Sequence, residues 1–394
     1  MAAPNANSYC SRLFIVKNVG WGNFGDLLMV EALTSEINKR LPGSKFLLPE
    51  GTLGVRLLST PNLYLEAPIH NTWKSILPGI NREQLLMLLS DRGHRLDSIS
   101  GIFDVNGFYI GEQWSPRQAK KVNLSHGFYA KHKKPIILLP KSFGPFGDRH
   151  LDRRAYYARS IVRNSLKTFC RDESSLKNLL EVCMDEPQLE AKIERGYDFT
   201  GDLKPLHLSE YGHLHNRPAI ILNPRMVDKV GSEQASAYLQ FIADLTETIS
   251  NMGSNPFFLV HAEGDQKLLE RIKFEREYRP EVVCPPSALA VKGVIGRASL
   301  VVSARLHGII NALSQGVPTI GTGWSHKYAA VFQDYGCESL MIGVNTSRSD
   351  IREKLEYGFA LKNDLAWRAK VGERQRFISG QNKAMWDCIA ENFI

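Results

Sequence analysis

The segment 299–321 constrains the fold more than any other part of this sequence. Ser299–Val302 is typical of a short buried strand, and Val317–Gly321 is typical of another. Apolar residues recur at helical spacing between them: Leu306, Ile309, Ile310 and Leu313. Gly316 followed by Pro318 is a stop signal for that helix. The segment therefore predicts a strand–helix–strand unit of a parallel sheet.

Two side chains with useful chemistry sit where this strand ends and the helix begins. Arg305 can hold a phosphate or carboxylate through two parallel hydrogen bonds, and His307 can transfer a proton near neutral pH. Ser303 directly precedes them. Ligands bind at this position in open α/β sheets, and the free N–H groups of a helix start favour an anion. A surface Arg–His pair at a helix cap would give the same local pattern.

The alternation of strands and helices continues along the 394 residues, a length that suits two domains. The polar segment 198–218 contains several glycines and prolines and is the predicted boundary. We expect a first domain at 1–205, a second at 206–375 and a C-terminal helix at 376–394. Domain clefts favour small-molecule chemistry, so a cleft between the two sheets is expected.

Composition narrows the class of partner. The net charge of +8 hints at anionic ligands or an anionic membrane surface, and no nucleic-acid-binding motif accompanies it. Six dispersed cysteines without CxxC spacing favour a reducing cytoplasm and no metal site. The first residues lack the apolar core of a signal peptide, and no run is apolar enough to span a bilayer. The prediction is a cytoplasmic protein, with the membrane surface left open.

Several strand ends of the second half carry groups suited to an anionic ligand. Arg225, His261 and Lys327 each follow a predicted strand, as Arg305 and His307 do. Parallel strands bring these loops to one edge of the sheet, which predicts a shared anion site. The alternative is that each cation pairs with its own carboxylate on the surface.

Strand ends of the first half are rich in amides and aromatics, which suit a sugar. The candidate acceptor contacts are Asn23, Asp26, Asn106, Glu112 and Lys141. Trp21, Tyr109 and Trp114 lie in the same loops, whereas Phe24 and Phe108 are expected in the core rather than at the site.

Taken with these loops, the chain resembles the polysaccharide pyruvyl transferase family from about residue 12 to about residue 345. The resemblance rests on Asn18–Asp26, Lys141–Pro145, Arg171–Ser175, Ser303–Gly308, and Gly316–Pro318 followed by Lys327. It implies two Rossmann-like domains in a GT-B-like arrangement. It also implies transfer of a pyruvyl group from phosphoenolpyruvate to two sugar hydroxyls, which forms a cyclic ketal and releases phosphate. Family members often have an Asp-Pro pair that is absent here, so either Asp198 or Asp202 could be the equivalent aspartate.

The resemblance also implies roles for individual residues. Arg305 and Lys327 would hold the donor with help from Arg225, and His307 would be the acid or stabilise the leaving phosphate. Ser303 and His261 complete the expected donor side. No metal or nucleotide is required, and the partners are phosphoenolpyruvate and a saccharide that could be lipid-linked.

Two other readings of the sequence stay open. A GT-B-type nucleotide-sugar glycosyltransferase or epimerase would need an acid such as Glu263 or Asp265 for the ribose. A non-catalytic carbohydrate-binding protein of the same fold would bind saccharide without releasing phosphate.

Overall fold

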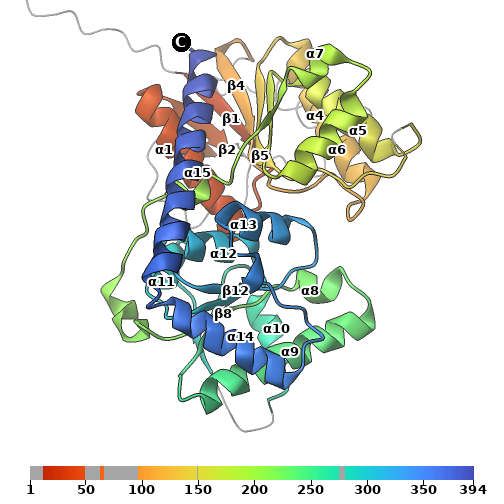
Figure 1. Cartoon of the computed structure of the whole chain (residues 1–394). Helices are drawn as coiled ribbons and strands as arrows, with labels where there is room; N and C mark the ends of the chain where they lie inside the picture. The colour runs from red at the N-terminus through yellow and green to blue at the C-terminus, as the bar shows by residue number, and fades with distance from the viewer. Residues whose placement is uncertain (1–11, 49–62, 66–95, 149, 275–279) are drawn as a thin grey trace, which may run out of the picture.

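The computed structural model describes residues 12–48, 63–65, 96–148, 150–274 and 280–394. Within these residues the chain forms two α/β domains, each built on a parallel sheet (Figure 1). This confirms the predicted fold class. Among the described residues, no helix combines the length and apolar character needed to cross a bilayer.

The first sheet is parallel throughout. Its strands are β1 Leu13–Lys17, β2 Lys45–Leu48, β3 Leu63–Leu65, β4 Ile99–Asp104, β5 Ile136–Lys141, β6 Lys167–Cys170 and β7 Ile193–Arg195. Their order is β3-β2-β1-β4-β5-β6-β7. The order reverses between β1 and β4, so the loops that follow these two strands flank a topological switch point.

The second sheet repeats this plan. Its strands are β8 Ala219–Ile221, β9 Phe257–Leu259, β10 Glu281–Val283, β11 Val301–Ser303 and β12 Thr319–Gly321. Their order is β10-β9-β8-β11-β12, again all parallel. The switch point lies between β8 and β11, and β11 is the strand that leads to Arg305 and His307.

Helices cover both faces of each sheet. The first domain has α1 Phe24–Arg40, α4 Pro116–Lys131, α5 Arg153–Asn164, α6 Glu173–Cys183 and α7 Pro187–Glu190. The second has α8 Arg225–Asp228, α9 Ser232–Asn251, α10 Asp265–Leu269, α11 Ala288–Ile295, α12 Leu306–Leu313, α13 Lys327–Tyr335 and α14 Arg348–Leu361. In the first domain, α4, α5 and α6 pack on one face of the sheet and α1 on the other.

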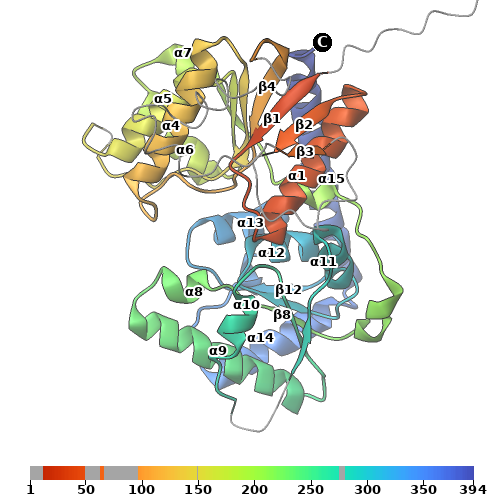
Figure 2. The same ribbon diagram turned by 180° about the vertical axis from the view of Figure 1, so that it is seen from behind.

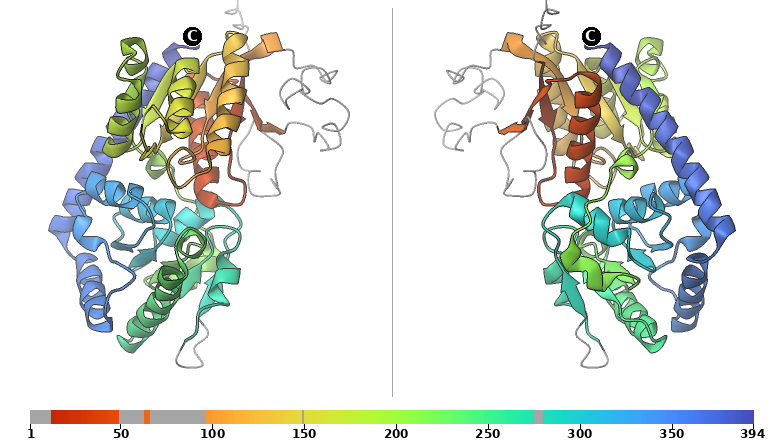
Figure 3. Two further views of the ribbon diagram at one scale, coloured as in Figure 1. Left: turned by 90° about the vertical axis from the view of Figure 1, so that its right-hand side faces the viewer. Right: turned by 90° about the vertical axis from the view of Figure 1, so that its left-hand side faces the viewer.

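The final helix, α15 Leu365–Glu391, returns the chain to the first domain (Figure 3). It starts at Leu365 rather than at the predicted 376, because the Asp364 side chain caps it by accepting hydrogen bonds from the N–H groups of Ala366 and Trp367. Near its end, Trp386 packs edge-on against the buried Phe199 ring. The helix therefore contributes to both domains.

The sequence pattern also predicts a helix over 266–277 and a last apolar strand at 340–343, and both differ from the structure. The expected last strand, 340–343, is a single turn of 3-10 helix, Glu338–Leu340, followed by one bridge from Met341 to Gly321. Its apolar residues pack into the core without joining the ladder. The helix expected over 266–277 ends at Leu269, and its last predicted residues lie outside the described part of the chain.

The two domains are tied by backbone hydrogen bonds at the base of α1. The Phe24 N–H donates to the His261 carbonyl at 3.1 Å, and the Glu263 N–H donates to the Gly22 carbonyl at 2.8 Å. Seen from behind, α1 reaches from the first sheet to the second domain (Figure 2). Its first turn packs into a core of second-domain residues. The loops after β1 and β9 are therefore fixed against each other.

Candidate active site

A cleft of about 830 Å³ lies between the two domains. Its walls are the loops that follow β1 and β4 in the first domain and β8, β9, β11 and β12 in the second. These loops flank both switch points, where open α/β sheets bind ligands. The volume is within the usual range of small-molecule sites.

The second-domain wall presents two helix N-termini to the cleft. Neither α12 nor α13 has a side-chain cap, and residues of both first turns line the cleft. Uncapped N–H groups and the helix dipole favour an anion at such positions. The two helix N-termini alone therefore make this wall favourable for an anion, and the cationic side chains add to their effect.

Lys327 stands at the start of α13. Its Nζ lies 5.0 Å from the centre of the Phe108 ring and 5.1 Å from that of Trp324. It has no carboxylate within ion-pair distance among the described residues. Burial, with repulsion from Arg171, lowers the pKa of Lys327 to about 7, although Asp26 and Asp172 oppose that shift. A bound anion would favour its charged form.

Arg305 lines the cleft, but part of its charge is already neutralised. Its Nη2 pairs with Asp265, and its Nε donates to the Leu222 carbonyl at 3.0 Å. In the described part of the chain, Nη1 has no hydrogen-bond partner. Arg305 is thus paired with a carboxylate, as the alternative expects, whereas Lys327 has no such partner in the residues that the structure describes.

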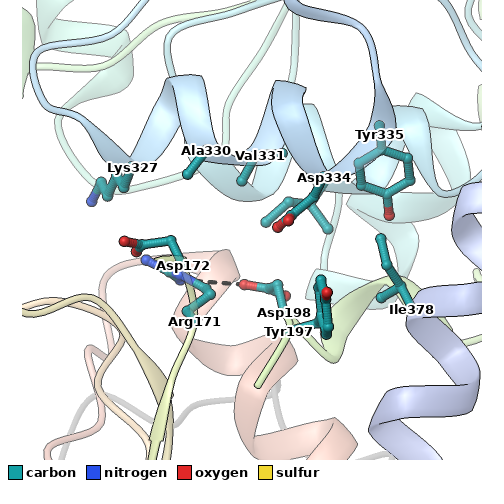
Figure 4. Close-up of a pocket in the computed structure, with 11 residues that line it drawn as sticks. Arg171, Asp172, Tyr197, Asp198, Lys327, Ala330, Val331, Asp334, Tyr335 and Ile378 are labelled. Carbon is teal, nitrogen blue, oxygen red and sulfur yellow. Dashed lines mark hydrogen bonds and ion pairs between the residues drawn. The ribbon is translucent and has the colours of Figure 1, made fainter. Parts of the chain in front are cut away.

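His307 faces Asp198 across the domain boundary. Its Nε2 lies 3.4 Å from Asp198 Oδ2, and its ring packs against Gly25 at the start of α1. Arg171 Nη1 donates to the same Asp198 oxygen at 3.2 Å (Figure 4). Burial acts to raise the pKa of Asp198, but His307 and Arg171 outweigh it and lower that pKa well below its usual range. Asp198 is therefore an anion that orients the imidazole.

The two candidate aspartates, Asp198 and Asp202, have different partners in the structure. Asp202 points away from His307 and binds α15: its side chain accepts hydrogen bonds from Gln375 at 2.9 Å and Asn382 at 2.8 Å. Asp198, four residues earlier, lies beside His307, although it is not among the residues that line the cleft. The Arg171 guanidinium also donates hydrogen bonds to the Gly107 carbonyl and to Ser142 Oγ. These contacts fix its position beside Asp198.

Asp26 lines the cleft from the first turn of α1. Burial raises the pKa of this carboxyl, while His307, Asn23 and Lys327 act in the opposite direction. A carboxyl with a raised pKa in a cleft is a candidate for proton transfer. Asn23 caps α1 by accepting from the Gly25 N–H at 3.1 Å.

An aromatic wall made of rings from both domains lines part of the cleft. The rings of Phe108, Trp114 and Trp324 have centroids 6.0 to 6.4 Å apart. Neither buried indole N–H has a hydrogen-bond partner among the described residues. Ring faces that pack on apolar surface and N–H groups that await an acceptor are what a sugar requires. Phe108 is buried, so it is both a core residue and part of this wall.

Three other predicted residues also line the cleft. Arg225 lies at the mouth, with its guanidinium carbon 5.7 Å from the Trp114 ring centre. His261 is fully buried, and neither ring nitrogen has a hydrogen-bond partner in the described residues. Burial, with repulsion from Arg305, holds the pKa of His261 well below its usual value. Asn106 lines the first-domain side.

Three predicted residues are not among those that line the cleft. Ser303 is buried, where its Oγ accepts from the Arg305 N–H at 3.0 Å and thus shapes the turn. Lys141 is buried and pairs with Asp104, so the structure corrects its expected role as an acceptor contact. Glu112 is exposed, and its carbonyl accepts from Arg154 at 2.9 Å.

Sequence reasoning assigned no role to Arg171 and Trp324, and it left Asp198 undecided. Arg171 ends β6 and Trp324 follows β12, so strand-end position was an available signal for both. Nothing local marks Asp198, because it joins the site only when the domains meet.

Two Rossmann-like domains that face each other across a cleft form the GT-B arrangement, and solved structures of this class share the fold. UDP-GlcNAc 2-epimerase from Methanocaldococcus jannaschii matches with a TM-score of 0.58 at 14% identity, over 88% of this chain and 92% of that one. UGT89C1 from Arabidopsis thaliana, complexed with UDP-L-rhamnose, matches with a TM-score of 0.58 at 11% identity, over 97% and 98%.

The family follows from the sequence match. The model of the family described as polysaccharide pyruvyl transferase matches residues 23–326, most of the chain. The chain therefore belongs to the polysaccharide pyruvyl transferase family, a family of transferases. The predicted resemblance is confirmed.

Proposed function

We propose that this protein transfers the pyruvyl group of phosphoenolpyruvate to two hydroxyls of one sugar residue in a polysaccharide or its precursor. The observation that carries the proposal is the second-domain wall, where two uncapped helix N-termini meet Lys327, a cation without an ion-pair partner in the described residues, in one cleft. Phosphoenolpyruvate carries both a phosphate and a carboxylate, so it requires several positive groups at short spacing.

The proposed donor lies against the starts of α12 and α13. Lys327 and Nη1 of Arg305 contact its anionic groups, and Arg171 adds positive potential from the opposite side. Because Arg305 is partly neutralised by Asp265, Lys327 carries more of the donor's charge than Arg305 does. The acceptor sugar lies on the aromatic wall, beside Asp26 and Asn23.

The proposed chemistry forms two C–O bonds to the same carbon, C2 of phosphoenolpyruvate, in two steps. In the first, an acceptor hydroxyl oxygen bonds to C2 of phosphoenolpyruvate while C3 gains a proton and becomes a methyl group. In the second, the neighbouring hydroxyl bonds to C2, the C–O bond to phosphate breaks, and the hydroxyl proton leaves with the phosphate. His307, oriented by Asp198, supplies the proton to C3, and Asp26 takes the first hydroxyl proton.

The test is incubation of the purified chain with phosphoenolpyruvate and a panel of glycosides that includes a β-galactoside. We expect a mass gain equal to pyruvate less one water on one acceptor, with one phosphate released per ketal. His307→Ala should lower turnover at least a hundredfold, as expected when a proton-transfer group is lost. Unchanged turnover in that variant would remove His307 from the mechanism.

A parallel measurement separates this function from nucleotide-sugar chemistry. Phosphoenolpyruvate should raise the melting temperature more than UDP-sugars do, because a ligand that binds only the folded state stabilises it. Stabilisation by UDP-sugars alone, without phosphate release, would favour the epimerase or glycosyltransferase alternative. Saccharide binding without phosphate release would favour a binding protein.

A further inference from the structure

The segment 113–171 is far more basic than the rest of the chain. It contains fourteen Lys and Arg residues and only two acidic residues, Asp148 and Asp152, for a net charge of +12. The whole chain has a net charge of +8, so everything outside this segment is net acidic by four charges. The positive net charge of the chain is therefore concentrated in the segment that contains α4 and α5.

On α4 this charge forms a stripe. Exposed residues recur at three- and four-residue steps along one side of the helix: Arg117, Lys120, Lys121, Leu124 and Lys131. The opposite side is buried against the sheet through Ala119, Val122, His126 and Tyr129. Residues at these spacings lie on one helix face, so the stripe points directly away from the sheet. None of its four cations has an ion-pair partner among the described residues.

Helix α5 lies beside α4 on the same face of the sheet (Figures 1 and 2). Arg153 and Tyr156 are exposed on its outer side, while Ala155, Ala158 and Ile161 face the core. Neither helix contains an acidic residue. We call the outward residues of both helices, together with Leu151 before α5, the α4–α5 basic face.

Large apolar side chains are exposed within this face. Leu124 is 55% exposed, Leu151 82% and Tyr156 62%. A soluble polyanion would gain nothing by covering them. Two interactions would favour binding of this face to an anionic bilayer: the headgroups attract the cations, and the interface accepts leucine and tyrosine side chains.

We propose that the α4–α5 basic face docks the protein on the surface of an anionic lipid bilayer. The face begins at the cleft mouth, since Trp114, Ser115 and Gln118 at the start of α4 line the cleft. Docking through this face therefore brings the cleft mouth next to the lipid surface. If the proposed function holds, a saccharide attached to a membrane lipid reaches the aromatic wall from there.

Cosedimentation of the full chain with vesicles tests the docking. One set of vesicles is phosphatidylcholine alone, and the other is equal parts phosphatidylcholine and phosphatidylglycerol. We expect binding only to the second set, weakened by salt. The triple variant Lys120→Gln, Lys121→Gln, Lys131→Gln should reduce partitioning by about tenfold to a hundredfold. Leu124→Ser should reduce it severalfold.

The matched control removes three exposed basic residues from the second domain, as Lys267→Gln, Arg271→Gln, Lys273→Gln. It should bind the anionic vesicles like the original chain. Equal losses in the two triple variants, or no vesicle binding at low ionic strength, would overturn the proposal. Tighter binding to a soluble acidic polysaccharide, insensitive to Leu124→Ser, would overturn the bilayer as the occupant.

A second readout separates this proposal from the proposed function. Turnover on a water-soluble glycoside should be unchanged in the α4 triple variant, because none of its three residues lines the cleft. Vesicle binding does not require turnover, so it can succeed or fail independently of the chemistry.

Discussion

At the scale of single residues, the site depends on contacts made across the domain boundary. His307 comes from α12 of the second domain, whereas Asp198 and Arg171 come from the first-domain side. The imidazole is thus oriented by a carboxylate that its own domain does not supply. Removing that carboxylate should affect catalysis more than folding.

Asp198→Asn should lower kcat about a hundredfold, because the amide no longer stabilises a cationic imidazole. Phosphate release from phosphoenolpyruvate measures this. Asp202→Asn is the matched control: it should keep kcat but lose about 1–3 kcal/mol of stability, since Asp202 binds α15. A kcat loss in Asp202→Asn that equals the loss in Asp198→Asn would contradict the assignment.

The pKa of Lys327, lowered to about 7 chiefly by burial, gives a pH dependence with a defined sign. The charged form attracts an anionic donor, and that form exists below the pKa. We therefore expect kcat/KM for phosphoenolpyruvate to fall as pH rises through about 7, approaching tenfold per unit. Lys327→Arg keeps its charge at these pH values and should lack this inflection. An unchanged inflection in the variant would assign it to another group.

Much of the second-domain wall could be predicted from sequence. Arg305, His307 and Lys327 follow predicted strands, and parallel strands bring such loops to one edge. The carboxylates that contact Arg305 and His307 were not predictable, because Asp265 and Asp198 reach them from other elements. Lys141 shows the limit of the position rule: it ends a strand, yet its side chain turns inward to Asp104.

At the scale of elements, α15 is the connection that the sequence described least well. The helical pattern of its apolar residues was evident, but the sequence did not indicate where the helix begins or that it packs against the first domain. Most buried strands were predicted because continuous apolar runs identify them. The run at 340–343 has the same composition, and only tertiary packing keeps it from forming a strand.

Trp386→Ala tests the contribution of α15 to the first domain. The side chain is 2% exposed and packs against Phe199, so its loss should cost about 3–5 kcal/mol of unfolding free energy. Urea denaturation measures the change. Leu365→Ala, on the same helix but 78% exposed, should change stability by less than about 0.5 kcal/mol. Similar effects in the two variants would mean that α15 does not anchor the first domain.

At the scale of the whole molecule, the domains share a core. Phe24, Leu27 and Leu28 of α1 pack with second-domain residues, while later residues of α1 pack on the first sheet. Lys292 of α11 also donates to the Thr200 and Gly201 carbonyls, at 2.8 and 2.9 Å. Because these contacts join the two domains, we expect the domains to unfold together.

We therefore expect one cooperative thermal transition, with equal calorimetric and van't Hoff enthalpies. Differential scanning calorimetry measures both. Leu28→Ala, in the shared core, should lower the midpoint without splitting the transition. Two resolved transitions, one of them insensitive to Leu28→Ala, would show that the domains unfold separately.

The backbone hydrogen bonds between the loops after β1 and β9 have a consequence for evolution and engineering. They run from main chain to main chain, so they persist through most side-chain replacements, and they set the distance between the halves. Grafting the first domain of a relative onto this second domain would succeed only if the graft preserves the spacing of Gly22 and Phe24. If the proposed function holds, new acceptor preferences are easier to reach by changing the rings at 108, 114 and 324 than by exchanging whole halves.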